Sequence, residues 1–139
     1  MATKDLFSQL KPQVALDFDT ISTDATTTGN IIDTQGFESV VVGLITGAVT
    51  DGDYTLQLKD SADGTTFAVV TDANLLGTEA GASFTADTDD DSISKLGYIG
   101  IKRYIRAEIV SSSTTSGAVI GAYCMLGDPK SGPDRTQTR

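Results

Sequence analysis

From Phe37 to Val70 the chain reads F-E-S-V-V-V-G-L-I-T-G-A-V-T-D-G-D-Y-T-L-Q-L-K-D-S-A-D-G-T-T-F-A-V-V, and this stretch contains the strongest local signals of secondary structure. Residues 37–45 are almost continuously apolar, which is typical of a strand covered on both faces. Residues 54–59 alternate apolar and polar side chains, which indicates a strand with one buried face. Asp-Gly pairs at 51–52 and 63–64 supply the positive φ angles of tight hairpin turns. The stretch therefore predicts three strands in an antiparallel meander.

The same patterns predict further structure on either side of this stretch. Val14, Leu16 and Phe18 share one side of an alternating segment, which predicts a half-buried strand. Residues 22–29 are polar and turn-rich, and they are predicted to form a loop. Residues 71–96 are less regular, and their predicted core anchors are Leu75, Leu76 and Phe84.

Residues 98–110 are predicted to form one continuous strand. Arg103 falls on its apolar side, so this side chain is predicted to point inward and to pair with an Asp. Residues 118–126 are small and apolar and predict the final strand, in which Cys124 is a small core residue. The apolar side of the 98–110 strand comprises Ile99, Ile101, Ile105, Ala107 and Ile109.

Together these segments predict an all-β fold of seven or eight short strands without a helix. Short strands separated by turn signals, with alternating faces, indicate a single antiparallel β-sandwich, either jelly-roll or immunoglobulin-like. The domain is predicted to span residues 13–127. Residues 1–12 are predicted to form an extended N-terminal arm, and residues 128–139 a polar C-terminal tail.

The composition excludes several classes of function. The 139 residues suffice for one domain, and 10 basic against 19 acidic residues give a net charge of −9. That charge argues against nucleic acid as a partner, because affinity for phosphates comes from Lys and Arg. The chain has no His and one Cys, so a His-based catalytic site, an internal disulfide and a Cys/His zinc site are excluded. No apolar run approaches the ~20 residues of a membrane helix, so no membrane partner is predicted.

Acidic clusters raise the question of a bound cation. Residues 60–64 resemble the start of a calcium loop, but position 12 of such a loop would be Thr71 instead of Glu, so an Asp-Gly hairpin is the preferred interpretation. Residues 87–91 form an acidic loop that either holds a hard cation or is simply solvated. Asp residues are abundant, but most lie in predicted turns and no Trp lines a groove. Neither an enzyme nor a cofactor is predicted.

One basic cluster, residues 102–106, interrupts the acidic chain. Lys102, Tyr104 and Arg106 share one face of the predicted strand and could meet an acidic partner surface. For Arg106 a partner contact is favoured over an internal ion pair. With the two chain ends, these residues form the predicted partner-binding set: Leu6, Phe7, Leu10, Lys102, Tyr104, Arg106, Lys130, Arg135 and Arg139.

Several sequence blocks resemble small structural proteins of tailed bacteriophages. The blocks are I-D-T-Q-G-F-E-S-V-V-V (32–42), T-D-G-D-Y-T-L-Q-L (50–58), S-A-D-G-T-T-F (61–67), G-Y-I-G-I-K-R-Y-I-R (97–106) and S-G-A-V-I-G-A-Y-C-M-L-G-D-P (116–129). The order of the blocks is more specific than any one of them. The resemblance starts at about Ile32 and does not cover the N-terminal arm.

The resemblance implies a head decoration, or capsid cement, protein. Such a protein binds the assembled major capsid protein on the outside of the head, is made in the host cytoplasm, and is commonly a homo-oligomer, with a trimer favoured and a dimer possible. Two alternatives stay open: another virion component, from the tail or the head–tail connector, and a carbohydrate-binding module on the virion surface. The residues considered for stacking on sugars are Tyr54, Tyr98, Tyr104 and Tyr123.

Overall fold

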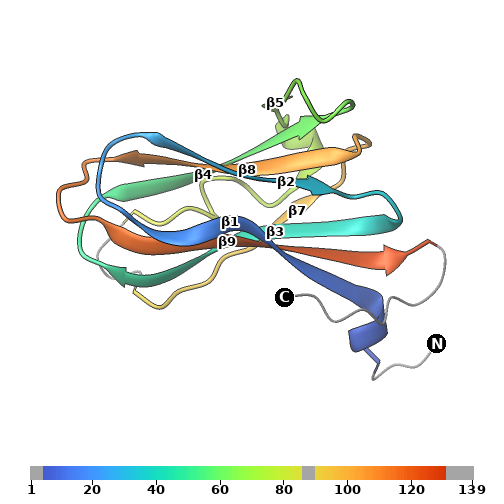
Figure 1. The fold of residues 1–139 in the computed structure, drawn as a ribbon, viewed down its shortest axis with the longest axis horizontal. Helices are drawn as coiled ribbons and strands as arrows, with labels where there is room; N and C mark the ends of the chain where they lie inside the picture. Colours follow the sequence, from blue (N-terminus) through green and yellow to red (C-terminus); the bar gives the residue numbers. More distant parts are fainter. Residues whose placement is uncertain (1–4, 86–89, 131–139) are drawn as a thin grey trace.

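The computed structural model describes residues 5–85 and 90–130, which form a β-sandwich of two antiparallel sheets lying one above the other (Figure 1). The first sheet has the order β1-β9-β3-β7-β6 and the second the order β2-β8-β4-β5. The predicted single β-sandwich is therefore confirmed. The strands are β1 (Leu10–Ile21), β2 (Thr26–Asp33), β3 (Phe37–Val49), β4 (Asp53–Ser61), β5 (Ala68–Val69), β6 (Leu75–Leu76), β7 (Leu96–Tyr98), β8 (Tyr104–Ser112) and β9 (Ala118–Pro129), with 3₁₀ turns η1 (Phe7–Gln9) and η2 (Asp72–Asn74).

The core lies between the two sheets and follows the strand alternation. In β4, Tyr54, Leu56 and Leu58 are fully buried, while the intervening side chains are more exposed. The first sheet contributes the matching inward row of β9, which includes Ile120 and Cys124. Burial of each large apolar side chain contributes about 1.5–3 kcal/mol, so these rows supply the main force that holds the sheets together.

The predicted three-strand meander is wrong at its first turn. β3 pairs with β9 and β7 in the first sheet, whereas β4 pairs with β8 and β5 in the second. The Thr50–Asp53 turn therefore carries the chain from one sheet to the other. The second hairpin is confirmed, because Lys59 pairs with Val69 across the 63–64 turn. Gly52 and Gly64 both have positive φ, at 98° and 76°, as an Asp-Gly turn requires.

The predicted alternation of β1 is interrupted by irregular register. β1 pairs with β9, with register shifts between Val14 and Leu16 and between Leu16 and Asp19. An extra residue in one strand turns neighbouring side chains to different faces. As a result Ala15 and Leu16 are both buried, whereas Val14 and Phe18 are 52% and 54% exposed. The prediction that Val14, Leu16 and Phe18 share one face is therefore wrong.

The predicted continuous strand over 98–110 is also wrong. β7 ends at Tyr98 in the first sheet and β8 begins at Tyr104 in the second, so residues 99–103 are a crossing between sheets. Ile99 is more than half exposed and Ile101 is fully exposed, while Tyr98 is buried. Arg103 points to solvent instead of inward, although it pairs with an Asp as expected.

Two smaller differences concern the ends of strands. β2 begins at Thr26, inside the predicted loop 22–29, because the β-branched threonines there suit an extended strand. β1 begins at Leu10 and β9 ends at Pro129, and Leu10 pairs with Gly127, so the borders of the predicted arm and tail belong to the sheet. Leu75 and Phe84 are buried as predicted, but Leu76 is exposed.

Three Asp carboxylates hold loops by accepting backbone hydrogen bonds. Asp51 binds the N–H groups of Thr115, Ser116 and Gly117 at 2.9–3.1 Å, which fastens the β8–β9 loop to the β3–β4 turn. These bonds lower the pKa of Asp51, and similar bonds from Thr66 and Thr65 lower the pKa of Asp63 to about 2. The side chain and backbone of Thr114 lower the pKa of Asp24 in the same way.

We expect acid to destabilise the fold through these groups. A carboxyl whose folded pKa lies below its unfolded value of ~3.9 stabilises the fold above that value, and the contribution is lost as the pH falls toward the folded pKa. The urea concentration at the midpoint of unfolding should therefore decrease as the pH is lowered from about 4 to about 2. Asp51→Asn should reduce proton uptake on unfolding at about pH 3 by a fraction of a proton. Asp72→Asn, in the exposed turn η2, is the control, and equal uptake in both variants would contradict the assignment.

Candidate partner-binding site

One end of the sandwich gathers segments that are far apart in the sequence. The register pairs Leu10 with Gly127, Asp33 with Tyr104 and Phe37 with Pro129, so the start of β1, the β2–β3 turn, the β7–β8 loop and the end of β9 meet there. This end lies at the right of Figure 1, and we call it the Lys102 end.

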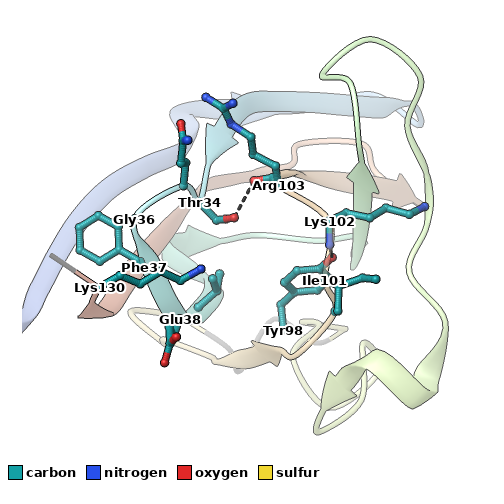
Figure 2. Close-up of a pocket in the computed structure, with 12 residues that line it drawn as sticks. Thr34, Gly36, Phe37, Glu38, Tyr98, Ile101, Lys102, Arg103 and Lys130 are labelled. Carbon is teal, nitrogen blue, oxygen red and sulfur yellow. Dashed lines mark hydrogen bonds between the residues drawn. The ribbon is translucent and has the colours of Figure 1, made fainter.

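A pocket of about 460 Å³ opens at the Lys102 end (Figure 2). It is lined by the β2–β3 turn, by the β7–β8 loop and by Lys130. Backbone bonds hold these segments together: the Thr34 N–H donates to the Arg103 carbonyl at 2.9 Å, and the Lys130 N–H donates to the Gly36 carbonyl at 2.8 Å. The Thr34 hydroxyl adds a second bond to the Arg103 carbonyl at 2.6 Å. The pocket walls are therefore fixed by the fold.

Two cations at this end, Lys102 and Arg103, form ion pairs within the chain. Arg103 donates two hydrogen bonds to Asp33, at 2.8 and 2.7 Å, and this contact lowers the pKa of Asp33. The Lys102 ammonium lies 3.2 Å from Asp60. Figure 2 shows the Lys102 and Arg103 side chains extending away from the pocket in different directions. The 102–106 segment is thus not a free basic patch.

A buried polar network anchors the β7–β8 loop. Asp60 is buried and accepts a hydrogen bond from the Tyr98 hydroxyl at 2.9 Å, and the Lys102 N–H donates to that hydroxyl at 3.2 Å. Burial and the bond to Asp60 raise the pKa of Tyr98 to about 12, so the hydroxyl keeps its proton at neutral pH. The loop therefore presents the fully exposed Ile101 from a well-held base.

The structure places most of the predicted partner-binding residues near this end. Leu6 and Phe7 are exposed at the start of η1, and Leu10 lies over Gly127 in the first sheet. Lys102 and Lys130 line the pocket, and Lys130 forms no ion pair within residues 5–85 and 90–130. Tyr104 begins β8 at the same end of the sandwich, opposite Asp33. Arg135 and Arg139 lie outside the described residues, as do residues 1–4 of the predicted arm.

The sequence favoured a contact between Arg106 and a partner, but the structure shows this side chain paired within the chain. Its guanidinium lies 3.2 Å from Glu108 and 4.3 Å from the centre of the Phe67 ring. The side chain therefore has partners within the chain, and the internal ion pair is the arrangement observed.

Sequence reasoning missed Ile101 and the pocket beside it. The one available signal was Arg103, whose place on the apolar side broke the alternation of the predicted strand. A cation at an inward position can mark the point where a strand has already ended. The interruption of the alternation at Arg103 reflects the structure, because residues 99–103 lie outside both β7 and β8.

Two of the four tyrosines considered for sugar stacking lie in the core. Tyr54 and Tyr98 are buried, so the interpretation of these two rings as exposed is wrong. Asp63 caps its own turn, as the hairpin interpretation of residues 60–64 requires. Within the described residues no three His, Cys, Asp or Glu side chains cluster as metal ligands, and residues 87–89 of the acidic loop lie outside that part of the chain.

Comparisons with protein-family models, with curated proteins and with solved structures find no match to this chain. No helix within residues 5–85 and 90–130 is long and apolar enough to cross a membrane.

Proposed function

We propose that this protein is a structural component of a bacteriophage virion: a capsid decoration protein that binds the assembled major capsid protein through the Lys102 end. The observation that carries the proposal is the convergence of Leu6, Phe7, Lys102, Tyr104 and Lys130 on one end of a rigid sandwich. These residues come from both ends of the chain and from a segment near residue 100. The resemblance of the sequence blocks to phage structural proteins gives the class of partner.

The chemistry of this end suits a protein lattice. Ile101, Leu6 and Phe7 are exposed apolar side chains, and such anchors supply most of the energy of protein interfaces when they enter a pocket. Lys102 and Arg103 are each paired with an Asp of the chain, so these two cations are not free to bind phosphate groups. Binding only the assembled shell would stabilise it by mass action.

The test is binding to undecorated capsids of the phage that encodes the chain. Wild-type protein should bind saturably, in hundreds of copies per particle, and should not bind free capsid subunits. Ile101→Asp should weaken binding about 30-fold, because it places a charge on the central anchor. Val110→Asp, on the opposite end of β8, is the matched control and should bind as wild type does.

Two results would overturn this proposal. Absence of saturable binding to the assembled lattice would exclude a decoration role. About a dozen copies in purified particles would instead indicate a connector component. Sugar binding on a glycan array that is lost on Tyr104→Ala would favour the adhesion alternative over lattice binding.

A further inference from the structure

The outer face of the first sheet is apolar across three long strands. Its side chains alternate with the buried row of each strand: Val41 pairs with Met125, and Tyr123 lies between Val14 and Gly43. Val14 and Phe18 are more than half exposed, and Val119 and Met125 are each 38% exposed. We call this surface the apolar face; it comprises Val14 and Phe18 of β1, Val41 and Ile45 of β3, and Val119, Tyr123 and Met125 of β9.

Two glycines make room for the aromatic rings of the apolar face. The Phe18 ring lies across Gly121, where an added methyl group would be 2.7 Å from a ring carbon. The Tyr123 side chain lies across Gly43, and its hydroxyl donates to the Ser94 carbonyl at 2.5 Å. Because this hydroxyl has a partner within the chain, Tyr123 offers only its ring to a binding partner. The apolar face therefore consists of aromatic rings and aliphatic side chains.

The apolar face holds no charged side chain in β3 or β9, whereas in β1 the exposed Asp17 and Asp19 flank Phe18 at its edge. Outward positions 41, 43, 45 and 47 of β3 and 119, 121, 123 and 125 of β9 hold no charged residue, although the chain has a net charge of −9. The outer face of the second sheet instead carries Lys59, Arg106 and Glu108, joined by ion pairs. A charged outer face of an antiparallel sheet can be exposed to water, whereas an exposed apolar patch is typical of an interface.

The charge and shape of this surface select a second copy of the same chain as the occupant. A twofold contact brings the same patch of both copies together, so any charge near its centre would meet a like charge. Two chains of charge −9 repel each other, and a face without charge at its centre lets them meet without close like-charge pairs there. A groove of about 310 Å³, lined by Pro12, Val14, Ile45 and Tyr123, lies beside the projecting Phe18 ring. In a twofold contact, the Phe18 ring of each copy can enter the groove of the other copy.

We propose that the apolar face binds a second copy of this chain in a twofold, face-to-face contact. This inference does not depend on the proposed function, which uses the Lys102 end. A twofold contact uses the same patch on both copies and leaves no such patch free for a third, so it closes as a dimer and not as a trimer. Strands about 4.8 Å apart give a face of roughly 500 Å², so two copies bury roughly 1,000 Å², near the lower limit of specific interfaces. The dimer should therefore form at micromolar concentration.

Sedimentation velocity of the full chain from about 1 µM to about 500 µM tests this proposal. Wild type should pass from monomer to dimer within this range. Met125→Asp should raise the dimer dissociation constant at least ~10-fold, because it places two negative charges in the contact. Val110→Asp, on the outer face of the second sheet and similarly exposed at 36%, is the control and should dimerise as wild type does. Circular dichroism checks that each variant is folded, and Val119→Asp replaces Met125→Asp if that variant is not.

A mixture of charge variants gives an independent readout. Met125→Lys alone should also weaken the dimer, but an equimolar mixture with Met125→Asp should associate more strongly than either variant alone, because the two faces then carry opposite charges. A wild-type chain that stays monomeric throughout the range would overturn the proposal. So would a wild-type trimer, or a Met125→Asp variant that dimerises as well as the Val110→Asp control.

Discussion

Gly117→Ala is expected to destabilise the fold by about 4 kcal/mol, whereas Gly36→Ala should cost about 1–2 kcal/mol. Both glycines have positive φ, at 90° and 93°, so both substitutions force an L-residue into a strained backbone conformation. At Gly36 an added methyl group meets no atom within 4 Å. At Gly117 it would lie 2.1 Å from the Ile21 carbonyl oxygen and 2.7 Å from the Ser22 Cα, and neither backbone atom can move aside cheaply.

The position of Gly117 explains why the loss should spread beyond one turn. Its carbonyl accepts a hydrogen bond from Thr50 at 3.0 Å, and its N–H donates to Asp51 at 2.9 Å. The residue therefore joins the β8–β9 loop, the β3–β4 turn and the end of β1. A backbone shift here disturbs all three connections.

Urea unfolding of the two variants measures the difference, and Cys124 supplies a second readout. Cys124 is fully buried, and burial raises the pKa of its thiol to about 12. A thiol reagent at neutral pH should therefore modify it only when the sandwich opens, and the Gly117→Ala variant should be modified much faster. Equal stability of Gly117→Ala and Gly36→Ala would contradict the steric explanation.

Glu108→Ala is expected to be the second large effect, at about 3 kcal/mol. The Glu108 side chain is 4% exposed, and its carboxylate lies 3.0 Å from Lys59 and 3.2 Å from Arg106. Removing it leaves two cations, 25% and 23% exposed, facing each other without their shared counter-charge. We use the lower end of the cost of breaking a buried ion pair, because both cations retain some contact with water.

Asp33→Asn is the matched control for this prediction. Asp33 and Arg103 form an ion pair of better geometry, but their side chains are 45% and 44% exposed, so water screens the interaction. The loss of stability should therefore be much smaller than for Glu108→Ala. Urea unfolding of both variants compares them, and an equal loss would show that burial does not govern the strength of these pairs.

The fold class was predictable from the sequence, but the partner of each strand was not. The alternation of residues 54–59 correctly identified the buried face of β4. The Asp-Gly turn at 51–52 has the backbone geometry of a hairpin, yet it connects β3 and β4 of different sheets. Turn residues specify a local reversal of the chain. They do not specify whether the next strand forms hydrogen bonds with the previous one or crosses to the facing sheet.

The candidate binding site was predictable only in part, for a similar reason. Leu6, Phe7, Lys102 and Lys130 stood out as exposed or basic residues near ends and breaks in the pattern, and they do lie at one end of the sandwich. Ile101 was assigned to the core, because alternation continued through the crossing between sheets. When apolar and polar residues go on alternating beyond the end of a strand, the sequence pattern does not show where the strand ends.

The residues alone were enough to predict a β-sandwich with Asp-Gly turns, because alternation and turn chemistry are properties of residues within one strand or turn. The pairing of Arg106 within the chain, the exposure of Ile101 and the outer face that Val14 and Phe18 share with Tyr123 are visible only in the folded protein. Those outcomes depend on register shifts and on pairings between strands about 100 residues apart. Such long-range pairings arise from closure of the whole sandwich, and no local pattern of side chains encodes them.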